Sequence, residues 1–332
     1  MILITGGTGY IGSHACVALV EAGHEVLLLD NLANSSLEAL ARLQKLVGKS
    51  LEFRQGDVRD AHLLRTLFAH FPIRAVVHFA GLKSVGDSVR APLVYFDNNV
   101  AGTLSLLAAM QKAGCRTLVF SSSATVYGEA ESMPVSEQAP LSVTNPYGRT
   151  KLIVEEVLCD LERSDPEWRF ARLRYFNPVG AHESALIGEN PHGTPTNLMP
   201  YVAQVANRER QEVQIFGGDY PTVDGTGVRD YIHVMDLAEG HVSALRYLNL
   251  HARGITLNLG TGKGTSVREM MRAFERASGR SIPFRVVARR PGDVASCFAD
   301  VSQANQTLGW SATRDIDKMC EDAWRWEQAK TR

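Results

Sequence analysis

A tyrosine and a lysine stand four residues apart within residues 145–151 (NPYGRTK). The proline starts a helix, so the side chains of Tyr147 and Lys151 lie on one helix face. A phenol has a pKa near 10 in water, and serving as a base near neutral pH requires lowering it by about 3 units, or about 4 kcal/mol. A lysine ammonium about 6 Å away supplies only about 2.8 kcal/mol at an effective dielectric constant of about 20. A second cation beside the phenol, such as an oxidised nicotinamide ring, would close the gap, so the pair implies a cofactor.

Taken alone, such a pair is more often an ordinary solvated pair on a surface helix, and the amino terminus supplies the second signal. Residues 2–5 (ILIT) read as a buried strand, residues 6–12 (GGTGYIG) as a glycine-rich turn, and the apolar periodicity that follows predicts a helix up to Gly23. Gly6 permits the tight turn, Gly9 lets the backbone approach a pyrophosphate, and Gly12 lets helix and strand pack closely. The helix N-terminus favours the anion.

The next predicted strand, residues 25–29, ends in Asp30. An acidic group at this place accepts hydrogen bonds from the adenosine ribose and would repel the additional phosphate of NADP. We therefore expect NAD as the cofactor.

The composition is that of an ordinary globular protein, with 332 residues, 45% of them hydrophobic and 21% charged. Lysine and arginine total 35 against 36 acidic residues, and the net charge of -1 gives no general attraction to nucleic acid or membrane. No apolar run approaches the roughly 20 residues that span a bilayer, and the chain starts without a charged leader, so we expect a cytoplasmic protein. Its 5 cysteines are widely spaced, and we expect neither a disulfide framework nor a metal.

Short apolar strands alternate with helical stretches up to about residue 175. Further strands are predicted at 51–55, 75–79, 117–121 and 170–175, and helices at 61–70, 100–112 and 146–161. This alternation predicts an α/β, doubly wound (Rossmann) parallel sheet, with ligands beyond the carboxyl ends of its strands. We expect a cofactor domain over residues 1–176 and a smaller mixed α/β substrate domain over 177–332, with segments near 234–260 packing back on the first.

Six further segments carry a family resemblance that covers nearly the whole chain. They are residues 79–83 (FAGLK), 97–100 (DNNV), 121–128 (SSSATVYG), 174–181 (RYFNPVGA), 197–200 (NLMP) and 227–234 (GVRDYIHV). With them the chain resembles the extended short-chain dehydrogenase/reductase family, and within it the UDP-glucose 4-epimerases. The resemblance implies the interconversion of UDP-glucose and UDP-galactose through transient oxidation of the sugar at C4 by bound NAD.

The resemblance also implies which residues form the site. Ser123 would complete the catalytic set with Tyr147 and Lys151. The cofactor would be bound by the glycine turn, which includes Tyr10 and Ile11, and by Asp30, Asn31, Asn34, Asp57, Val58, Phe79, Ala80, Gly81, Lys83, Asn98, Lys151 and Tyr175. The UDP-sugar would be bound by the catalytic Ser123 and Tyr147 and by Lys83, Asn177, Asn197, Leu198, Phe216, Arg229, Tyr231, Arg290, Asp293 and Cys297.

Several of these residues have an alternative structural interpretation. Ser123 can relay a proton, but its hydroxyl can also simply cap the following turn. Arg229 and Arg290 offer forked donors suited to a diphosphate, or pair with the nearby Asp230 and Asp293. His78 and His233 lie in apolar, strand-like runs, and we expect them to be packed in the core.

Cys297 occupies the position at which the resemblance places either a bulky tyrosine or a small residue beside the C2 substituent of the sugar. A small side chain there predicts that the N-acetylhexosamine pair is accepted as well; alternatively, Cys297 is only a small core residue. The resemblance further implies a homodimer through residues 100–112 and 146–161, whose apolar faces could equally belong to the core.

Four other functions are compatible with parts of the sequence. A 4,6-dehydratase needs acidic groups to eliminate water from the sugar. Ser123 is followed by Ala124 and Thr125, which carry no carboxylate, so dehydration is disfavoured. A decarboxylase, or an epimerase for a uronic acid or a pentose, remains open. A nucleotide sensor without chemistry is disfavoured by the intact Tyr147, Lys151 and Ser123.

Overall fold

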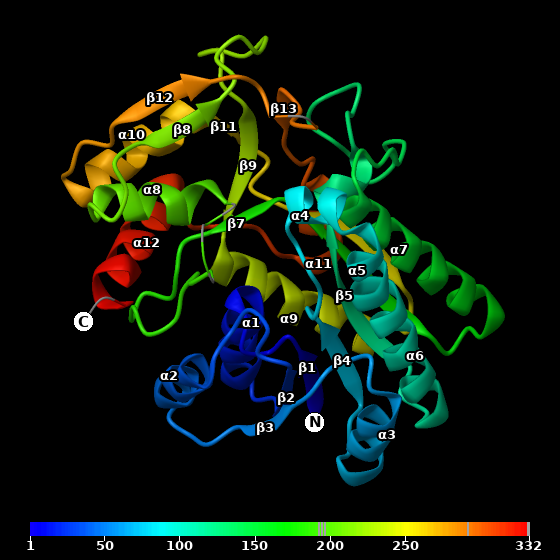
Figure 1. Cartoon of the computed structure of the whole chain (residues 1–332). Helices are drawn as coiled ribbons and strands as arrows, with labels where there is room; N and C mark the ends of the chain where they lie inside the picture. Colours follow the sequence, from blue (N-terminus) through cyan, green and yellow to red (C-terminus); the bar gives the residue numbers. More distant parts are fainter. Residues whose placement is uncertain (192, 194, 196, 291, 331–332) are drawn as a thin grey trace.

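The computed structural model describes residues 1–330 apart from 192, 194, 196 and 291, and its centre is a seven-stranded parallel sheet (Figure 1). The strand order is β10-β6-β5-β4-β1-β2-β3, so the direction of winding reverses between β1 and β4. This confirms the predicted doubly wound fold. The strands are β1 (Ile2–Thr5), β2 (Val26–Asp30), β3 (Glu52–Gln55), β4 (Ala75–His78), β5 (Thr117–Ser123), β6 (Arg169–Tyr175) and β10 (Ile255–Leu259).

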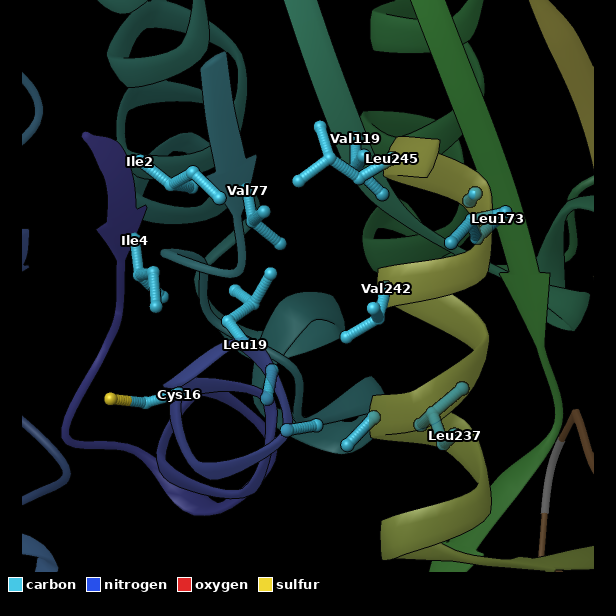
Figure 2. Close-up of a cluster of buried hydrophobic side chains, with 14 of the residues drawn as sticks. Ile2, Ile4, Cys16, Leu19, Val77, Val119, Leu173, Leu237, Val242 and Leu245 are labelled. Carbon is cyan, nitrogen blue, oxygen red and sulfur yellow. The ribbon is translucent and has the colours of Figure 1, made fainter. Parts of the chain in front are cut away.

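Helices cover both faces of this sheet. Helices α1 (Tyr10–Glu21), α2 (Leu37–Val47) and α9 (Val234–His251) share one apolar core with the sheet, while α3 (Ala61–His70), α6 (Gly102–Lys112) and α7 (Pro146–Ser164) share another on the opposite face. Figure 2 shows the first core, where side chains of several strands face the adjacent helices α1 and α9. The residues from 234 to 259 therefore lie with the large sheet, although strands of the smaller sheets both precede and follow them in the chain.

The rest of the chain forms two small sheets and their helices. In one sheet β9 (Val228–His233) pairs with β11 (Gly264–Ser266), β13 (Ser296–Cys297) and β7 (Asn177–Val179); in the other β8 (Val213–Phe216) pairs with β12 (Phe284–Val287). Helices α8 (Leu198–Ala206), α10 (Val267–Ser278) and α12 (Ile316–Lys330) pack into a third apolar core, and α11 (Ser302–Leu308) lies beside α9 and β10.

Local signals account for the helix that carries the tyrosine and lysine. Asn145 accepts a hydrogen bond from the Gly148 amide at 2.9 Å, and Pro146 occupies the first turn, where its missing N–H costs nothing. The helix predicted over residues 100–112 is present as α6, and only its beginning differs from the prediction. A π-helical turn, η1 (Phe96–Ala101), precedes α6, and it contains Asn99, whose side chain binds the Leu82 backbone. Periodicity alone does not reveal such a turn.

Three short elements complete the first half of the chain, namely α4 (Val85–Arg90), α5 (Pro92–Tyr95) and the 3-10 turn η2 (Ala124–Tyr127). Within the part of the chain that the structure describes, none of the helices combines the length and the apolar character needed to cross a bilayer.

Leu19 tests the core between α1 and the sheet, in which it is fully buried. We expect Leu19→Ala to lower the free energy of unfolding by about 2–5 kcal/mol, because the truncation leaves a cavity. Leu250 on α9 is 72% exposed, and Leu250→Ala is the control, with an expected change within about 0.5 kcal/mol. Urea unfolding followed by circular dichroism measures both free energies. If Leu19→Ala also changed the free energy of unfolding by less than about 0.5 kcal/mol, this core would contribute little to stability.

Candidate active site

The glycine turn between β1 and α1 lies at the point where the winding of the sheet reverses. Gly6 has a φ of +67°, and a Cβ there would lie 2.8 Å from the Ala80 nitrogen. A Cβ on Gly12 would lie 2.1 Å from the Gly6 oxygen. Gly9 is the N-cap of α1, so the first free amides of the helix open beside this turn. Because side chains are excluded, a phosphate can approach the backbone closely.

Asp30 ends β2 as the sequence predicts, and its carboxylate braces the turn. One oxygen accepts the Thr8 amide at 3.1 Å, and the other accepts the Leu32 amide and the Ser35 hydroxyl, each at 2.9 Å. Asp30 therefore fixes the turn and the loop after β2 in one position. Its contact with a ribose remains a prediction.

The next predicted cofactor residues lie at the end of β3. Asp57 accepts hydrogen bonds from Arg59 Nε at 2.9 Å and from Asn31 at 3.0 Å. The hydrogen bonds from Arg59 hold the pKa of the Asp57 carboxyl well below its usual range. Arg59 also pairs with Asp97 at 2.5 Å, and the sequence analysis did not single it out.

A cavity lies beside the glycine turn. Its wall combines the predicted cofactor residues Tyr10, Asn34 and Lys83 with Thr8, Ser35, Ser36 and Ala39 and with residues 188–191. Small polar side chains around a glycine turn fit a dinucleotide, and they include the Asp30-bound Ser35.

Glu189, on the wall of this cavity, joins a predicted cofactor residue to a predicted substrate residue. One oxygen, Oε1, accepts hydrogen bonds from Lys83 Nζ and from Asn197 Nδ2, each at 2.7 Å. The Glu189 carbonyl is itself held by the indole N–H of Trp326 at 3.0 Å. Sequence reasoning missed Glu189, because an acidic residue in a loop gives no sign of partners so distant in the chain.

Helix α7 brings the predicted catalytic residues together against the end of β5. The buried Lys151 ammonium donates to the Ser121 carbonyl at 2.6 Å and lies 5.9 Å from the centre of the Tyr147 ring. Ser123 forms a hydrogen bond with the Tyr147 phenol. The Ser123 hydroxyl also accepts from the Thr125 amide at 3.2 Å, which is the capping alternative, while its part in moving a proton stays a prediction.

Burial opposes the ionisation that the chemistry requires. Burial raises the pKa of Tyr147 to about 12, although the hydrogen bond with Ser123 lowers it. Burial lowers the pKa of Lys151 to about 8, and the negative charge of Glu155 raises it. The protein groups by themselves therefore do not produce a phenolate near neutral pH. A further cation beside the phenol is needed, in line with the estimate made from the sequence.

The segment after β4 lies next to the lysine. Gly81 is so close that an added Cβ would meet Lys151 Nζ at 3.9 Å and Asn99 Oδ1 at 3.3 Å. Asn99 anchors this segment, since its side-chain amide binds the Leu82 backbone and Thr150, and contact of the neighbouring Asn98 with the cofactor stays a prediction.

Other predicted residues at this edge are packed against aromatic rings. Tyr175 is buried, bonds to the Ser121 hydroxyl and lies 5.6 Å from the His241 ring; Phe79 lies 4.8 Å from the same ring. Val58 and Ala80 pack in the core shared with α3, α6 and α7, and Ile11, on α1, packs in the core on the opposite face of the sheet.

Both histidines expected in the core are buried, which confirms that expectation. His78 bonds through its two ring nitrogens to Thr5 and Thr103, and His233 pairs with Asp322 at 3.2 Å. Across the described residues, no group of three or more His, Cys, Asp or Glu side chains is arranged to hold a metal ion.

The predicted substrate residues converge through the small sheets. On β9, Arg229 lies in register with Cys297 of β13, and Tyr231 with Asn177 of β7. The Asp230 carboxylate faces away, accepting the amides of residues 261, 262 and 299, so Asp230 does not neutralise Arg229.

Of the two roles considered for Arg290, the structure contains the pairing with Asp293, and contact with a diphosphate stays a prediction. Arg290 pairs with Asp293 at 2.9 Å, as the structural alternative predicts, and its guanidinium lies 5.4 Å from the centre of the exposed Phe216 ring. Asn197 is the N-cap residue of α8, and Leu198, its first residue, packs against the third core.

Comparisons with known proteins agree with this geometry. A family model described as GDP-mannose 4,6 dehydratase matches residues 3–323. UDP-glucose 4-epimerase of Bacillus subtilis is 56% identical over 328 residues, which are 99% of this chain and 97% of that protein.

Solved structures extend the likeness to the whole fold. UDP-glucose-4-epimerase from Stenotrophomonas maltophila, crystallised with bound NAD and formylated UDP-arabinopyranose, has a TM-score of 0.98 and 55% identity, covering 99% of this chain and 98% of that chain. The UDP-Glc/GlcNAc 4-epimerase of Campylobacter jejuni has a TM-score of 0.86 and 37% identity, covering 99% of both chains.

Gly12 tests whether the glycine turn holds the cofactor. We expect Gly12→Ala to lose most of the NAD that copurifies with the protein, because its Cβ would force the Gly6 carbonyl to move. Gly86→Ala is the control, since no atom lies within 4 Å of a Cβ at that position. Absorbance of the nucleotide released by denaturation measures NAD per chain. Equal NAD content in the two variants would contradict the assignment.

Proposed function

This chain belongs to the UDP-glucose 4-epimerase family of extended short-chain dehydrogenases, and from that premise we propose which of its residues perform the reaction. Its activity is the NAD-dependent interconversion of UDP-glucose and UDP-galactose. The observation that supports the assignment of residues is the set of Tyr147, Lys151 and Ser123 at the carboxyl end of β5, in which Lys151 and Ser123 are buried and Tyr147 is half-buried.

When bound, NAD accepts the hydride from C4 of the hexose and returns it, and its positive ring supplies the second charge beside the phenol. Tyr147 removes the proton from the 4-hydroxyl and later gives it back, acting as general base and then general acid. Ser123 hydrogen-bonds the same sugar oxygen and the phenol. Lys151 opposes the effect of burial on the phenol through its charge.

The two parts of the chain divide the work between cofactor and substrate. Residues 1–176 hold the cofactor, and residues 177–332 hold the nucleotide and diphosphate through Arg229, Arg290 and Asn197. Inversion at C4 requires the hexose to turn over without leaving, so the nucleotide is held firmly and the sugar loosely. Because the same cofactor is reduced and reoxidised in one cycle, the protein retains it tightly.

The chain acts as a cytoplasmic homodimer without nucleic-acid or membrane partners. Support for the dimer comes from apolar side chains on neighbouring elements, since Leu93 on α5 is 82% exposed and Val89 on α4 is 63% exposed. The balanced charge supports the absence of a polyanionic partner.

Tyr147→Phe tests the base. We expect kcat for UDP-galactose to fall by about 10²–10⁴, with NAD content and folding unchanged, because the variant lacks only the ionisable oxygen. Tyr247→Phe on α9, where the ring packs on His251, should keep full activity. Turnover of UDP-galactose without added NAD measures both. Near-normal turnover by Tyr147→Phe would show that another group is the base.

Cys297 sets the substrate range beside the C2 substituent of the sugar. It is a small, half-buried residue level with Arg229, and burial raises the pKa of its thiol to about 11, so it stays neutral. The Campylobacter jejuni structure shows that a protein of this fold can be a UDP-Glc/GlcNAc epimerase. We therefore assign the N-acetylhexosamine pair to this chain as well.

Cys297→Tyr should lower kcat/KM for UDP-N-acetylgalactosamine by at least about tenfold and leave UDP-galactose within a few-fold, since the larger ring fills the space of the acetyl group. Cys297→Gly should keep both substrates. Competing assays of the two sugars measure the ratio. If the native protein and Cys297→Gly exclude acetylated sugars equally, Cys297 is only a small core residue.

A further inference from the structure

A buried carboxylate lies one turn beyond Lys151 on α7. Glu155 accepts hydrogen bonds from Arg174 Nε at 3.0 and 3.2 Å and from Arg174 Nη2 at 2.5 Å, and it also accepts the Ser122 hydroxyl. All three side chains are buried. None of the roles described above uses them.

The three side chains meet at the level of the catalytic groups. Ser122 lies on β5 between Ser121, whose carbonyl receives the Lys151 ammonium, and Ser123, which bonds the phenol. Arg174 is the neighbour of Ser122 in register on β6. Glu155 therefore joins the helix that carries the phenol and the ammonium to the strand that carries their partners.

The connection continues into the sheet, which fixes the carboxylate in place. Arg174 Nη1 donates to the Tyr127 hydroxyl at 3.1 Å and to the Glu137 carbonyl at 3.2 Å, and Tyr127 donates to Asn258 of β10 at 2.6 Å. A buried ion pair is poor evidence for stability, because apolar residues of similar volume often serve as well. Such a pair beside catalytic groups calls for a different explanation.

The charge of Glu155 also acts on the lysine. Besides Glu155, titratable groups near the Lys151 ammonium include Tyr147 on the same helix and Tyr175 on β6, whose hydroxyl bonds to the Ser121 side chain. They also include His78 on β4, whose pKa burial lowers to about 3, so that it is neutral. Burial lowers the pKa of Lys151 to about 8, and Glu155 raises it. The carboxylate thus supports the charged form of the lysine near neutral pH.

We propose that Glu155 is a positioning residue of the reaction, whose carboxylate, anchored by Arg174 and Ser122, holds Tyr147 and Lys151 in register with the end of β5 and keeps the lysine charged. This inference rests on the proposed function of Tyr147 and Lys151. The rival explanation is that the ion pair only docks α7 on the sheet.

The same helix and strand provide a matched control. Arg172 of β6 binds Glu162 of α7 at 2.7 Å, farther from the catalytic residues and near the end of the helix. We compare Glu155→Gln/Arg174→Gln with Glu162→Gln/Arg172→Gln, so that neither double variant leaves a buried charge unpaired. Ser122→Ala, which removes only the contact with β5, is the milder third variant.

In the Glu155/Arg174 variant we expect kcat for UDP-galactose to fall at least about tenfold, because small displacements of catalytic groups have large effects on rate, with KM changed little. Of the two charges removed, that of Glu155 is the one that raises the pKa of Lys151, so in the variant this pKa falls, the lysine loses its proton at lower pH and the alkaline limb of the kcat profile moves to lower pH. Ser122→Ala should lower kcat several-fold at an unchanged melting temperature.

The control variant should lose thermal stability while keeping kcat and the pH profile of the native enzyme. Lysine ¹³Cε resonances, with Lys151→Met to assign the signal, report the titration of Lys151 independently of turnover. The proposal is overturned if the Glu155/Arg174 variant has native kcat and native Lys151 titration. If that variant does not fold, native kcat in Ser122→Ala overturns the proposal instead. Failure of the proposed function would instead appear in the native enzyme, as absent epimerisation.

Discussion

The structure depends on keeping a lysine ammonium charged where water is excluded. Lys151 is buried, and its nearest polar contact is the Ser121 carbonyl, at the carboxyl end of a strand in the middle of the large sheet. A charge buried in this way is costly unless hydrogen bonds and opposite charges offset the lost hydration. The strand end, helix α7 and the Glu155 carboxylate all contribute to that offset, so their relative positions are tightly constrained.

The same exclusion of water opposes ionisation of the tyrosine. Burial raises the pKa of Tyr147, yet a charge near the phenol acts more strongly in a dry site than in water. The opposing effects mean that the phenol ionises near neutral pH only when enough positive charge surrounds it. On the proposed assignment, the cationic nicotinamide ring of bound NAD supplies this charge, so that cofactor binding is linked to the reactivity of a residue on another helix.

The sequence predicts what local spacing determines. Four-residue spacing places Tyr147 and Lys151 on one helix face, and the glycine turn with its flanking strand and helix occurs where expected. The spacing did not predict that the pKa of Tyr147 is raised, because this shift depends on burial by the whole fold. The apolar periodicity did not reveal the π-helical turn that contains Asn99 for a similar reason. The Asn99 side chain binds Leu82 and Thr150, which lie far away in the chain.

Long-range contacts decide the substrate side, and there the family resemblance supplied what the residues alone could not. Arg229 and Cys297 are neighbours only because β13 pairs with β9. Glu189 makes a comparable long-range contact on the cofactor side, since one of its oxygens accepts hydrogen bonds from both Lys83 and Asn197. A shift of either donor changes the acceptor available to the other. The positions of the two predicted ligand-binding residues are therefore coupled through one buried carboxylate, and this coupling exists only in the folded chain.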